Sequence, residues 1–291
     1  MNLVEFQQKF NNEQACLDYL EHSRWGDKAI CPHCGSVKTY KFASGKLFKC
    51  GGCRKQFTAK VGTIFSDSKI PLYKWFLAIY LATSLKKGIS SIQLSKYIGV
   101  TQKTAWFMLQ RIRFALEKSG NGFMLQNEVE VDETYVGGTR KLAQKYSNKS
   151  IVFGMVERGG KAKMKHVKSS GSRVLLPEIQ TALDRIATVY SDEWGVYKTL
   201  PRLGYPHETV KHYKLEFKRG NAHTNTVEGL WSHFKRGIDG IYIHVSDKHM
   251  QKYCSEYEYR YNTRDMSDIE RFSQWFAHSL CRLTYKELIN G

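Results

Sequence analysis

Apolar residues recur at two different periods along this chain. In residues 1–27 they follow one side of a helix, which predicts one or two short amphipathic helices. Residues 70–88 are apolar almost throughout and predict one buried helix that ends at Gly88. After a break at residues 119–122, alternating segments predict strands interspersed with helices. The N-terminal residues that carry the first pattern are Leu3, Phe6, Phe10, Leu17 and Leu20.

Two more helices are predicted after Gly88. Ser90 or Ser91 can cap a helix that ends at Gly99, and Thr101 can cap the next one. Apolar positions then fall where a helix-turn-helix buries its core. These positions are Ile92, Leu94, Ile98, Val100, Ala105 and Leu109.

Such a helix-turn-helix would expose Gln102, Lys103 and Thr104 at the start of its second helix. A recognition helix meets the edges of DNA bases at that place. A plain three-helix bundle, used for packing or for dimer contacts, fits the same pattern. A basic, cysteine-rich segment precedes these helices, and it favours the DNA-binding interpretation.

The remaining residues predict an α/β domain with a mixed sheet. The stretch NEVEVDETYVGG alternates like a strand, and IVFGMVERGG and KMKHVKSSG resemble a second and a third. RVLLPEIQTALD predicts a helix that crosses to a short fourth strand at residues 187–190, and NTVEGLWSHFKRGI predicts a later helix. This order of elements is the layout of an RNase H-like domain.

Composition narrows the class of protein. The chain has 291 residues, of which 42% are apolar, so it can bury ordinary cores in two or three domains. Its formal charge of +18 favours a polyanionic partner, most simply nucleic acid, although charge alone also fits a basic protein that binds nothing in particular. No apolar run reaches about 18 residues, so no membrane span or membrane partner is expected. The acidic N-terminus is unlike a secretory signal, and a cytoplasmic, nucleoid-associated protein is expected.

Four of the seven cysteines have the spacing of a zinc site. Cys31, Cys34, Cys50 and Cys53 form C-x2-C-x15-C-x2-C, with a predicted hairpin turning at Ser44-Gly45 between the pairs. Two such pairs can give the tetrahedral four-sulfur shell of one structural Zn²⁺. Redox-active motifs or unrelated thiols are the alternative.

The other residues of this region have simpler interpretations. His33 is expected to be exposed, since four sulfurs complete the shell. Cys16, Cys254 and Cys281 are expected to be ordinary buried thiols. The basic residues of this predicted zinc ribbon are suited to contacts with phosphate groups. They are Lys38, Lys41, Lys46, Lys49, Arg54, Lys55 and Lys60.

The predicted strand in NEVEVDETYVGG carries several acidic residues, which is unexpected in so basic a chain. Asp132 is taken to end this strand, Asp192 follows the fourth strand, and Glu228 is on the later helix. Carboxylates from two strands and one helix can hold two Mg²⁺ (or Mn²⁺) ions, which promote cutting or joining of phosphodiesters. A basic surrounding surface would bind DNA, while the acidic centre would hold metal ions that face the scissile phosphate.

With these landmarks the chain resembles insertion-sequence transposases of the ISXO-like branch, which have an N-terminal zinc ribbon, a helix-turn-helix and a three-carboxylate DDE domain. The resemblance covers nearly the whole length. It rests on CPHCGS, CGGCRKQFTAKVGTIF, VDETYVGG, YSDEWGVY, NTVEGLWSHFKRGIDGIYIHVSDKH and YRYN.

The resemblance implies cleavage and strand transfer at terminal inverted repeats of double-stranded DNA, in a homo-oligomeric complex, with water first freeing a 3′-OH. It implies Asp132, Asp192 and Glu228 as catalytic metal ligands, with Lys235, and Arg236 beside it, contacting DNA. Some relatives use Asn as the third metal residue.

Asn225 lies three positions before Glu228 on the same helix face, so it stays open as a catalytic alternative. Carboxylate binds Mg²⁺ better than an amide does, which favours Glu228.

Neighbouring residues have less specific interpretations. Glu128 and Glu130 share a strand face with Asp132 and can help shape the site, but they are expected to be exposed or paired with a nearby Lys. Glu133 and Glu193 are expected to point away from the site. His223 and His233 can touch DNA or be structural. Trp194 and Trp231 can stack on a flipped base, but core packing is expected for both. Basic residues in segments 139–168 and 198–219 are interpreted as DNA-backbone contacts, with a solvated face as the alternative.

Together these features predict a multidomain α+β protein. The expected parts are an N-terminal helical segment (1–27), a zinc ribbon (28–66), a helix-turn-helix domain (67–120) and an RNase H-like catalytic domain (121–291). A DNA transposase is the leading hypothesis. A non-catalytic DNA-binding regulator derived from a transposase, and a structure-selective nuclease, are the alternatives.

Overall fold

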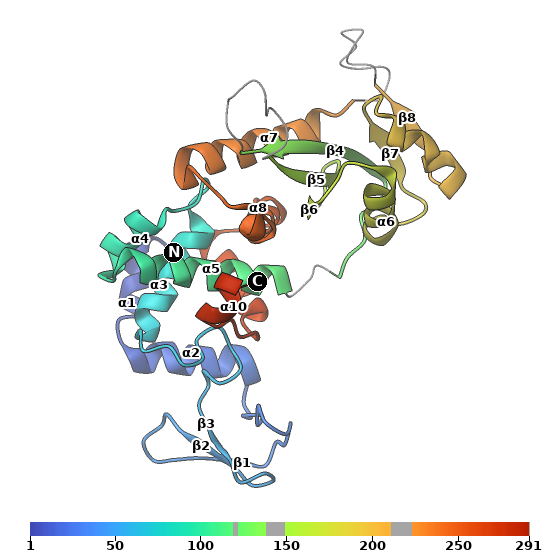
Figure 1. The fold of residues 1–291 in the computed structure, drawn as a ribbon. Coiled ribbons are helices and arrows are strands. Elements are labelled where there is room, and N and C mark those ends of the chain that lie inside the picture. The colour runs from blue at the N-terminus through green and yellow to red at the C-terminus, as the bar shows by residue number, and fades with distance from the viewer. Residues whose placement is uncertain (119–121, 138–148, 211–222, 291) are drawn as a thin grey trace. The chain divides into compact units, whose positions relative to one another are not determined.

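The computed structural model divides the chain into two compact units (Figure 1). It describes residues 1–118, 122–137, 149–210 and 223–290. The first unit contains Met1–Ser119 together with Met266–Gly291, and the second contains Gly120–Asp265. The sequence predicted one domain over 121–291, whereas the C-terminal residues pack with the N-terminal helices. Each unit is described by itself below.

Helices of the first unit surround an aromatic core. Phe6, Phe76 and Phe272 come from three different helices, and their rings lie 4.9–5.7 Å apart where they pair directly. Arg111 is buried beside this core, where its guanidinium donates to the carbonyls of Ile64 and Leu283. The helices are α1 (Leu3–Lys9), α2 (Glu13–Trp25), α3 (Leu72–Ser84), α4 (Ser91–Ile98), α5 (Gln102–Lys118), α9 (Asp268–Trp275) and α10 (Tyr285–Asn290), with the 3-10 helix η6 (Phe276–His278).

A small three-stranded sheet follows α2. Strands β1 (Thr39–Lys41), β2 (Phe48–Cys50) and β3 (Gln56–Phe57) pair antiparallel in the order β1-β2-β3. Phe48 and Phe57 stack with ring centroids 5.4 Å apart and give this sheet its own small core. The hairpin predicted between the two cysteine pairs is therefore confirmed.

The predicted boundaries of α4 and α5 are confirmed. The Ser90 hydroxyl accepts from the Gln93 N–H, and Gly99 ends α4 in the left-handed conformation with φ 62°. The Thr101 hydroxyl accepts from the Thr104 N–H at the start of α5. Each hydroxyl cap contributes about 1 kcal/mol to helix stability. The turn between the two helices is thus specified locally.

The second unit is built on a mixed five-stranded sheet of order β6-β5-β4-β7-β8. The first three strands pair antiparallel, while β7 joins β4, and β8 joins β7, in parallel. The strands are β4 (Glu128–Val136), β5 (Ser150–Glu157), β6 (Ala162–Val167), β7 (Thr188–Ser191) and β8 (His207–Thr209). The α-helices are α6 (Ser172–Ala182), α7 (Asn225–Gly237) and α8 (Met250–Asn262), and the shorter turns are η2 (Gly195–Leu203), η4 (Ile238–Tyr242) and η5 (Asp247–His249).

Alternation along the strands gives this sheet two packed faces. Val129 and Val131 pack against α6 and η2, whereas Val136 packs with α7 and α8 on the other face. Successive strand residues point to opposite faces, so Glu130 and Asp132 belong to the α7 face. In the part of the chain that the structure describes, no helix is long and apolar enough to cross a membrane.

Candidate active site and zinc site

Asp132 lies in the middle of β4 rather than at its end. The strand continues to Val136, because β5 pairs with it as far as Val136↔Ser150. On its other edge, β4 pairs with β7 only as far as Glu130↔Tyr190. The sequence therefore misjudged where the strand stops, but Asp132 does lie just beyond the paired part of that edge.

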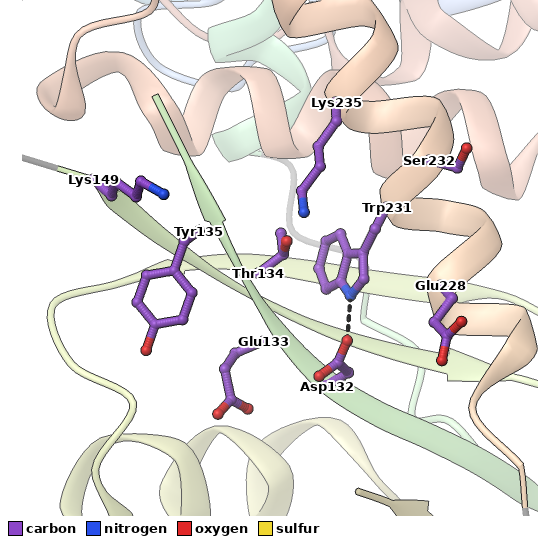
Figure 2. Close-up of a pocket in the computed structure, with 9 residues that line it drawn as sticks. All are labelled: Asp132, Glu133, Thr134, Tyr135, Lys149, Glu228, Trp231, Ser232 and Lys235. Carbon is purple, nitrogen blue, oxygen red and sulfur yellow. Dashed lines mark hydrogen bonds between the residues drawn. The ribbon is translucent and has the colours of Figure 1, made fainter. Parts of the chain in front are cut away.

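Trp231 fixes the Asp132 carboxylate. Its indole Nε1 donates to Asp132 Oδ2 at 2.8 Å, and Figure 2 shows this bond inside the pocket. Gly154 lies opposite Asp132 in the sheet register. A Cβ at Gly154 would stand 2.5 Å from the indole ring. The glycine therefore allows the indole to lie close against the strand, and Trp231 is buried, as predicted for core packing.

Helix α7 presents four residues to one open pocket beside β4. Glu228, Trp231 and Lys235 are three and four positions apart, so they share one helix face (Figure 2). The pocket has a volume of about 570 Å³. Its lining residues are Asp132, Glu133, Thr134, Tyr135, Lys149, Glu228, Trp231, Ser232 and Lys235.

Asp192 follows β7 and lies close to Asp132, although it does not line this pocket. The parallel pairing ends at Glu130↔Tyr190, two residues before each of these carboxylates, and the charge of Asp192 acts on Asp132. The Trp194 N–H donates to Asp192 Oδ1 at 3.0 Å and holds the turn after the strand.

Burial and like charges act on Asp132. Burial raises the pKa of Asp132 to about 6, and the charges of Asp192 and Glu228 add to that rise, while the bond from Trp231 opposes it. The negative charges of Asp192 and Glu228 thus lie near Asp132. A divalent cation would offset these charges.

Glu133 points to the opposite face of β4 from Asp132, but the charges of Asp132 and Asp192 also act on its carboxylate. Burial raises the pKa of Glu133 to about 7, the hydrogen bond from the buried Tyr197 hydroxyl opposes the rise, and Asp132 and Asp192 add to it. The sequence expected Glu133 to point elsewhere. It lies on the other face, yet it still lines the pocket. Its link to Tyr197 could not be anticipated from sequence.

The three predicted carboxylates are near one another but not gathered at ligand distance. Glu228 is exposed, and its Oε1 accepts from the Thr224 hydroxyl at 2.9 Å. Asn225, the alternative third ligand, is exposed at the first position of α7 and does not line the pocket. Among the described residues, the only group of three or more His, Cys, Asp or Glu side chains placed to hold a metal ion is that of Cys31, Cys34, Cys50 and Cys53.

The expectation for Glu130 is wrong. Glu130 is wholly buried, not exposed, and its ionic partner is Arg158 rather than a Lys, at 2.7 Å. Glu128 also lies near Arg158, at 3.4 Å, and accepts from the Tyr190 hydroxyl. Glu130 faces the start of α7, and that long-range contact keeps water from it.

Trp194 was expected to pack in a core, and this expectation is wrong. Its side chain is 49% exposed, and its indole Nε1 donates to the Ser170 carbonyl at 3.3 Å. The Ser170 hydroxyl lies 3.2 Å from the hydroxyl of Tyr135, which lines the pocket. Trp194 lies two residues after Asp192, and its ring belongs to neither hydrophobic core of the second unit. An exposed aromatic ring therefore stands near the carboxylates.

The histidines and Arg236 have separate surroundings. His223 is half-buried, with Nδ1 3.0 Å from Glu130 Oε1, and His233 is exposed on α7. Arg236 is exposed beside Lys235 but does not line the pocket. The proposed contacts at Lys211, Lys214, Lys218 and Arg219, and the basic part of segment 139–168 before Lys149, lie outside the described residues.

The four predicted cysteine ligands converge in the first unit. Their sulfurs all lie within 4.8 Å of one another, with Cys31–Cys53 at 3.7 Å and Cys34–Cys50 at 3.6 Å. A regular tetrahedron with Zn–S bonds of about 2.3 Å has sulfurs about 3.8 Å apart. The arrangement therefore fits one structural Zn²⁺.

Other expectations for the thiols and the first knuckle are largely met. His33 is exposed and lies outside the sulfur cluster. Cys16 and Cys254 are buried, whereas Cys281 is partly exposed, which corrects the expectation for that thiol.

The predicted DNA-reading residues lie at the start of α5. Gln102 and Lys103 are exposed and Thr104 is partly exposed. Gln102 donates to the Ser91 hydroxyl, and the Lys103 ammonium lies 5.1 Å from the ring centre of Tyr285. The helix start is thus open to solvent and supported by α4 and α10.

Comparison with known proteins adds an independent finding. Residues 124–262 match the ISXO2-like transposase domain, and residues 11–56 match the transposase zinc-ribbon domain. Over these two segments the chain is similar to transposases. Thus the resemblance drawn from the sequence is confirmed.

A curated relative is consistent with these domains. It is described as an uncharacterized protein in transposable element ISH50 of Halobacterium salinarum. It is 29% identical over 254 residues, which cover 79% of this chain and 84% of the relative.

Proposed function

We propose that this chain is an insertion-sequence transposase that cleaves and joins DNA strands at the pocket between β4 and α7. The observation that carries the proposal is one pocket lined by Asp132, Glu228 and Lys235 within the residues that match the transposase domain. The charge of Asp192 reaches Asp132 in the same place.

The strand order supports an RNase H-like catalytic domain. Three antiparallel strands, then two parallel strands added to the other edge of β4, give the order β6-β5-β4-β7-β8. Helices cover both faces. In this layout Asp132 is on β4, Asp192 follows β7 and Glu228 is on α7, the strand and helix positions expected of such a domain.

Asp132, Asp192 and Glu228 are the residues that would hold two Mg²⁺ (or Mn²⁺) ions. Their oxygens are the donors that Mg²⁺ prefers. Burial is the main cause of the raised pKa of Asp132, and a cation would offset the charges of Asp192 and Glu228 that add to it. Bound there, the metal ions would activate the attacking hydroxyl and stabilise the leaving oxygen. Asn225 remains the alternative third ligand.

The other pocket residues act on geometry and on DNA. Trp231 holds the Asp132 carboxylate by its indole N–H and shields its face from water. Lys235 lines the same pocket and would bind phosphate as a point charge. Arg236 would contact the DNA backbone beside it. Together these groups would orient the scissile phosphate at Asp132.

The first unit would recognise the element's ends. The exposed start of α5, with Gln102, Lys103 and Thr104, supports a helix-turn-helix that reads base edges of double-stranded DNA. Exposed lysines of the zinc ribbon, such as Lys38 and Lys49, would add phosphate contacts. A homo-oligomer would bring two terminal repeats to target DNA.

The exposed ring of Trp194 would add a base contact near the cut. Its backbone is tied to Asp192 and its indole to Ser170, so the ring is held in place. A fixed, exposed aromatic ring is a stacking surface for an unpaired base.

Incubation of the full-length protein with a mini-transposon and Mg²⁺ tests the proposal. We expect cleavage at the terminal repeats that frees 3′-OH ends, followed by their joining to target DNA. Mapping both products by sequencing distinguishes a transposase from a nuclease, which would cut without joining. Selective end binding with no metal-dependent cleavage would contradict the proposal and favour a regulator.

A further inference from the structure

Glu130 is a charged residue that the proposed chemistry does not use. It lies on β4, two residues before Asp132 and on the same face, and its side chain is 0% exposed. A buried carboxylate is strongly unfavourable unless it is paired and hydrogen-bonded. Its partners should therefore reveal what it holds in place.

Glu130 accepts hydrogen bonds from the beginning of α7. Its Oε2 accepts from the backbone N–H groups of Thr226 at 2.7 Å and Val227 at 3.0 Å. Its Oε1 accepts from the Thr226 hydroxyl at 2.9 Å. The first N–H groups of a helix lack partners within the helix and attract negative charge. Glu130 thus satisfies the N-terminus of α7 from a neighbouring strand.

Arg158 completes this anchor. Its Nε donates to Glu130 Oε1 at 2.7 Å, and its Nη2 donates to the His223 carbonyl at 2.9 Å, just before α7. The guanidinium also lies 4.0 Å from the ring centre of Tyr190 on β7. One ion pair therefore ties β4, β7, the end of β5 and the approach to α7.

The residue that would ordinarily cap α7 does something else. Thr224 occupies the capping position but makes no side-chain cap bond. Its hydroxyl donates to Glu228 Oε1 instead, at 2.9 Å. Because Glu130 already satisfies the helix N-terminus, the Thr224 hydroxyl can engage the Glu228 carboxylate.

Hydrogen bonds then connect β4 to α7 at two places, one on each side of Glu228. Glu130 holds the helix at Thr226 and Val227, and Asp132 accepts from Trp231 about one turn further along. Two fixed points on one helix restrict both its sliding and its rotation. Glu228 lies between them.

We propose that Glu130, through Arg158 and Thr224, is a positioning residue that sets Glu228 beside Asp132 for metal binding. This inference rests on the proposed function, because it concerns the same pocket. Glu130 would touch neither the metal nor DNA. Its effect would reach the reaction through the placement of α7.

The test compares Glu130→Gln with wild-type protein, full-length and zinc-loaded. Gln has the same shape but loses the charge that faces Arg158 and the helix N-terminus. Mutating a residue that orients a metal ligand typically lowers metal affinity or activity by about 10- to 100-fold. We therefore expect the Mg²⁺ concentration for half-maximal end cleavage to rise by about that factor. Affinity for the DNA ends should stay within about twofold, since Glu130 is buried away from DNA.

Mn²⁺ binding without DNA, measured by electron paramagnetic resonance, supplies the second readout. Wild-type protein should bind Mn²⁺, Asp132→Asn should lose it, and Glu130→Gln should bind it about 10-fold more weakly or worse. A Glu130→Gln protein that loses thermal stability but keeps wild-type Mn²⁺ affinity and Mg²⁺ dependence would overturn the positioning role. Wild-type protein that neither binds Mn²⁺ nor cleaves would instead overturn the proposed function.

Thr224→Val keeps the proposal testable if Glu130→Gln fails to fold. Thr224 is 2% exposed, and Val has nearly its shape, so this variant removes the hydroxyl bond to Glu228 and leaves the ion pair intact. Weaker Mn²⁺ binding at unchanged stability is the expected result. Unchanged Mn²⁺ affinity in Thr224→Val would contradict the proposal.

Discussion

The four-cysteine cluster and the carboxylate pocket both contain residue types that bind metal ions, but they differ in how closely those residues are gathered. The four cysteine sulfurs lie within 4.8 Å of one another. Asp132 and Glu228 line one open pocket, and Asp192 lies near it, yet their oxygens do not converge as the sulfurs do. A structural metal completes a local fold, whereas a catalytic site keeps room for substrate.

The two sites also differ in what holds them. Two short turns and one hairpin between residues 31 and 53 set the sulfurs, so the spacing of the cysteines is nearly sufficient. The carboxylates come from β4, from the residue after β7 and from α7, and their surroundings include the long-range contacts of Trp231, Gly154 and Glu130. Removing metal should therefore unfold the first site and leave the second largely intact.

Loss of zinc should give the largest effect. Cys31→Ser combined with Cys50→Ser removes one thiolate from each pair. Zinc in such sites contributes about 10–16 kcal/mol of binding free energy that is also folding free energy, so the ribbon should unfold. Metal analysis of the purified full-length protein should fall from about one equivalent of zinc to none.

Cys281→Ser is the matched control for that experiment, because this partly exposed thiol lies outside the sulfur cluster. It should retain full zinc content. Full zinc content in the double variant would contradict the assignment of the four ligands.

Neutralising a pocket carboxylate should give the next largest effect. Asp132→Asn or Asp192→Asn removes a ligand charge, and metal ions contribute several kcal/mol to such reactions, so the cleavage rate should fall by about 10³-fold or more. DNA affinity should persist or rise, since a negative charge that faces phosphate is lost. Rates and end affinities measured side by side check both expectations.

The exposed Asp239→Asn, which removes one negative charge away from the pocket lining, is the control and should cleave normally. Wild-type cleavage by Asp132→Asn would refute the mechanism. The same assay decides the third ligand: an inactive Asn225→Ala with an active Glu228→Gln would assign that role to Asn225.

Local signals in the sequence were enough to predict much of the fold. The cysteine spacing, the Ser90 cap, Gly99 and the alternation of β4 each depend on residues close in sequence, and all are confirmed. The order of predicted elements indicated Asp132 and Glu228, and the family resemblance indicated Lys235; all three line one pocket.

Long-range packing could not be predicted in the same way. Glu130 is buried because α7, almost a hundred residues later, covers it, and no local pattern marks that contact. Trp194 is exposed although it is a large aromatic residue. Residues 266–290 pack with the first unit, which only the folded chain reveals. Gly154, inside an apolar strand, was the one available sign of a close approach.

Gly154→Ala should test whether the pocket is held by packing. The new methyl group would collide with the Trp231 indole, and such overpacking destabilises by about 1–3 kcal/mol. Displacing the indole should also release its bond to Asp132, so cleavage should weaken together with stability. Thermal unfolding and cleavage assays of the full-length variant measure both effects.

Gly229→Ala provides a control of the opposite sign. Gly229 is exposed in the middle of α7, and nothing lies within 4 Å of an added Cβ. Replacing a helical glycine by alanine stabilises by about 1 kcal/mol. If Gly154→Ala were as stable as wild type, the indole would not be held against β5 in the way described.

Removing the exposed ring of Trp194 should give the smallest effect. This ring is absent from both hydrophobic cores and 49% exposed, so Trp194→Ala should barely change stability. Stacking on a base contributes about 1–3 kcal/mol, so binding of a pre-cleaved end should weaken by about 10-fold. Trp194→Phe should keep most of the affinity, because a smaller ring still stacks. A 2-aminopurine base placed near the cleavage site reports stacking directly: its fluorescence should change on binding wild-type protein and change less with Trp194→Ala. Equal affinity and equal fluorescence for the two proteins would show that this ring does not contact a base, and would confine the DNA contacts of the pocket to its charged residues.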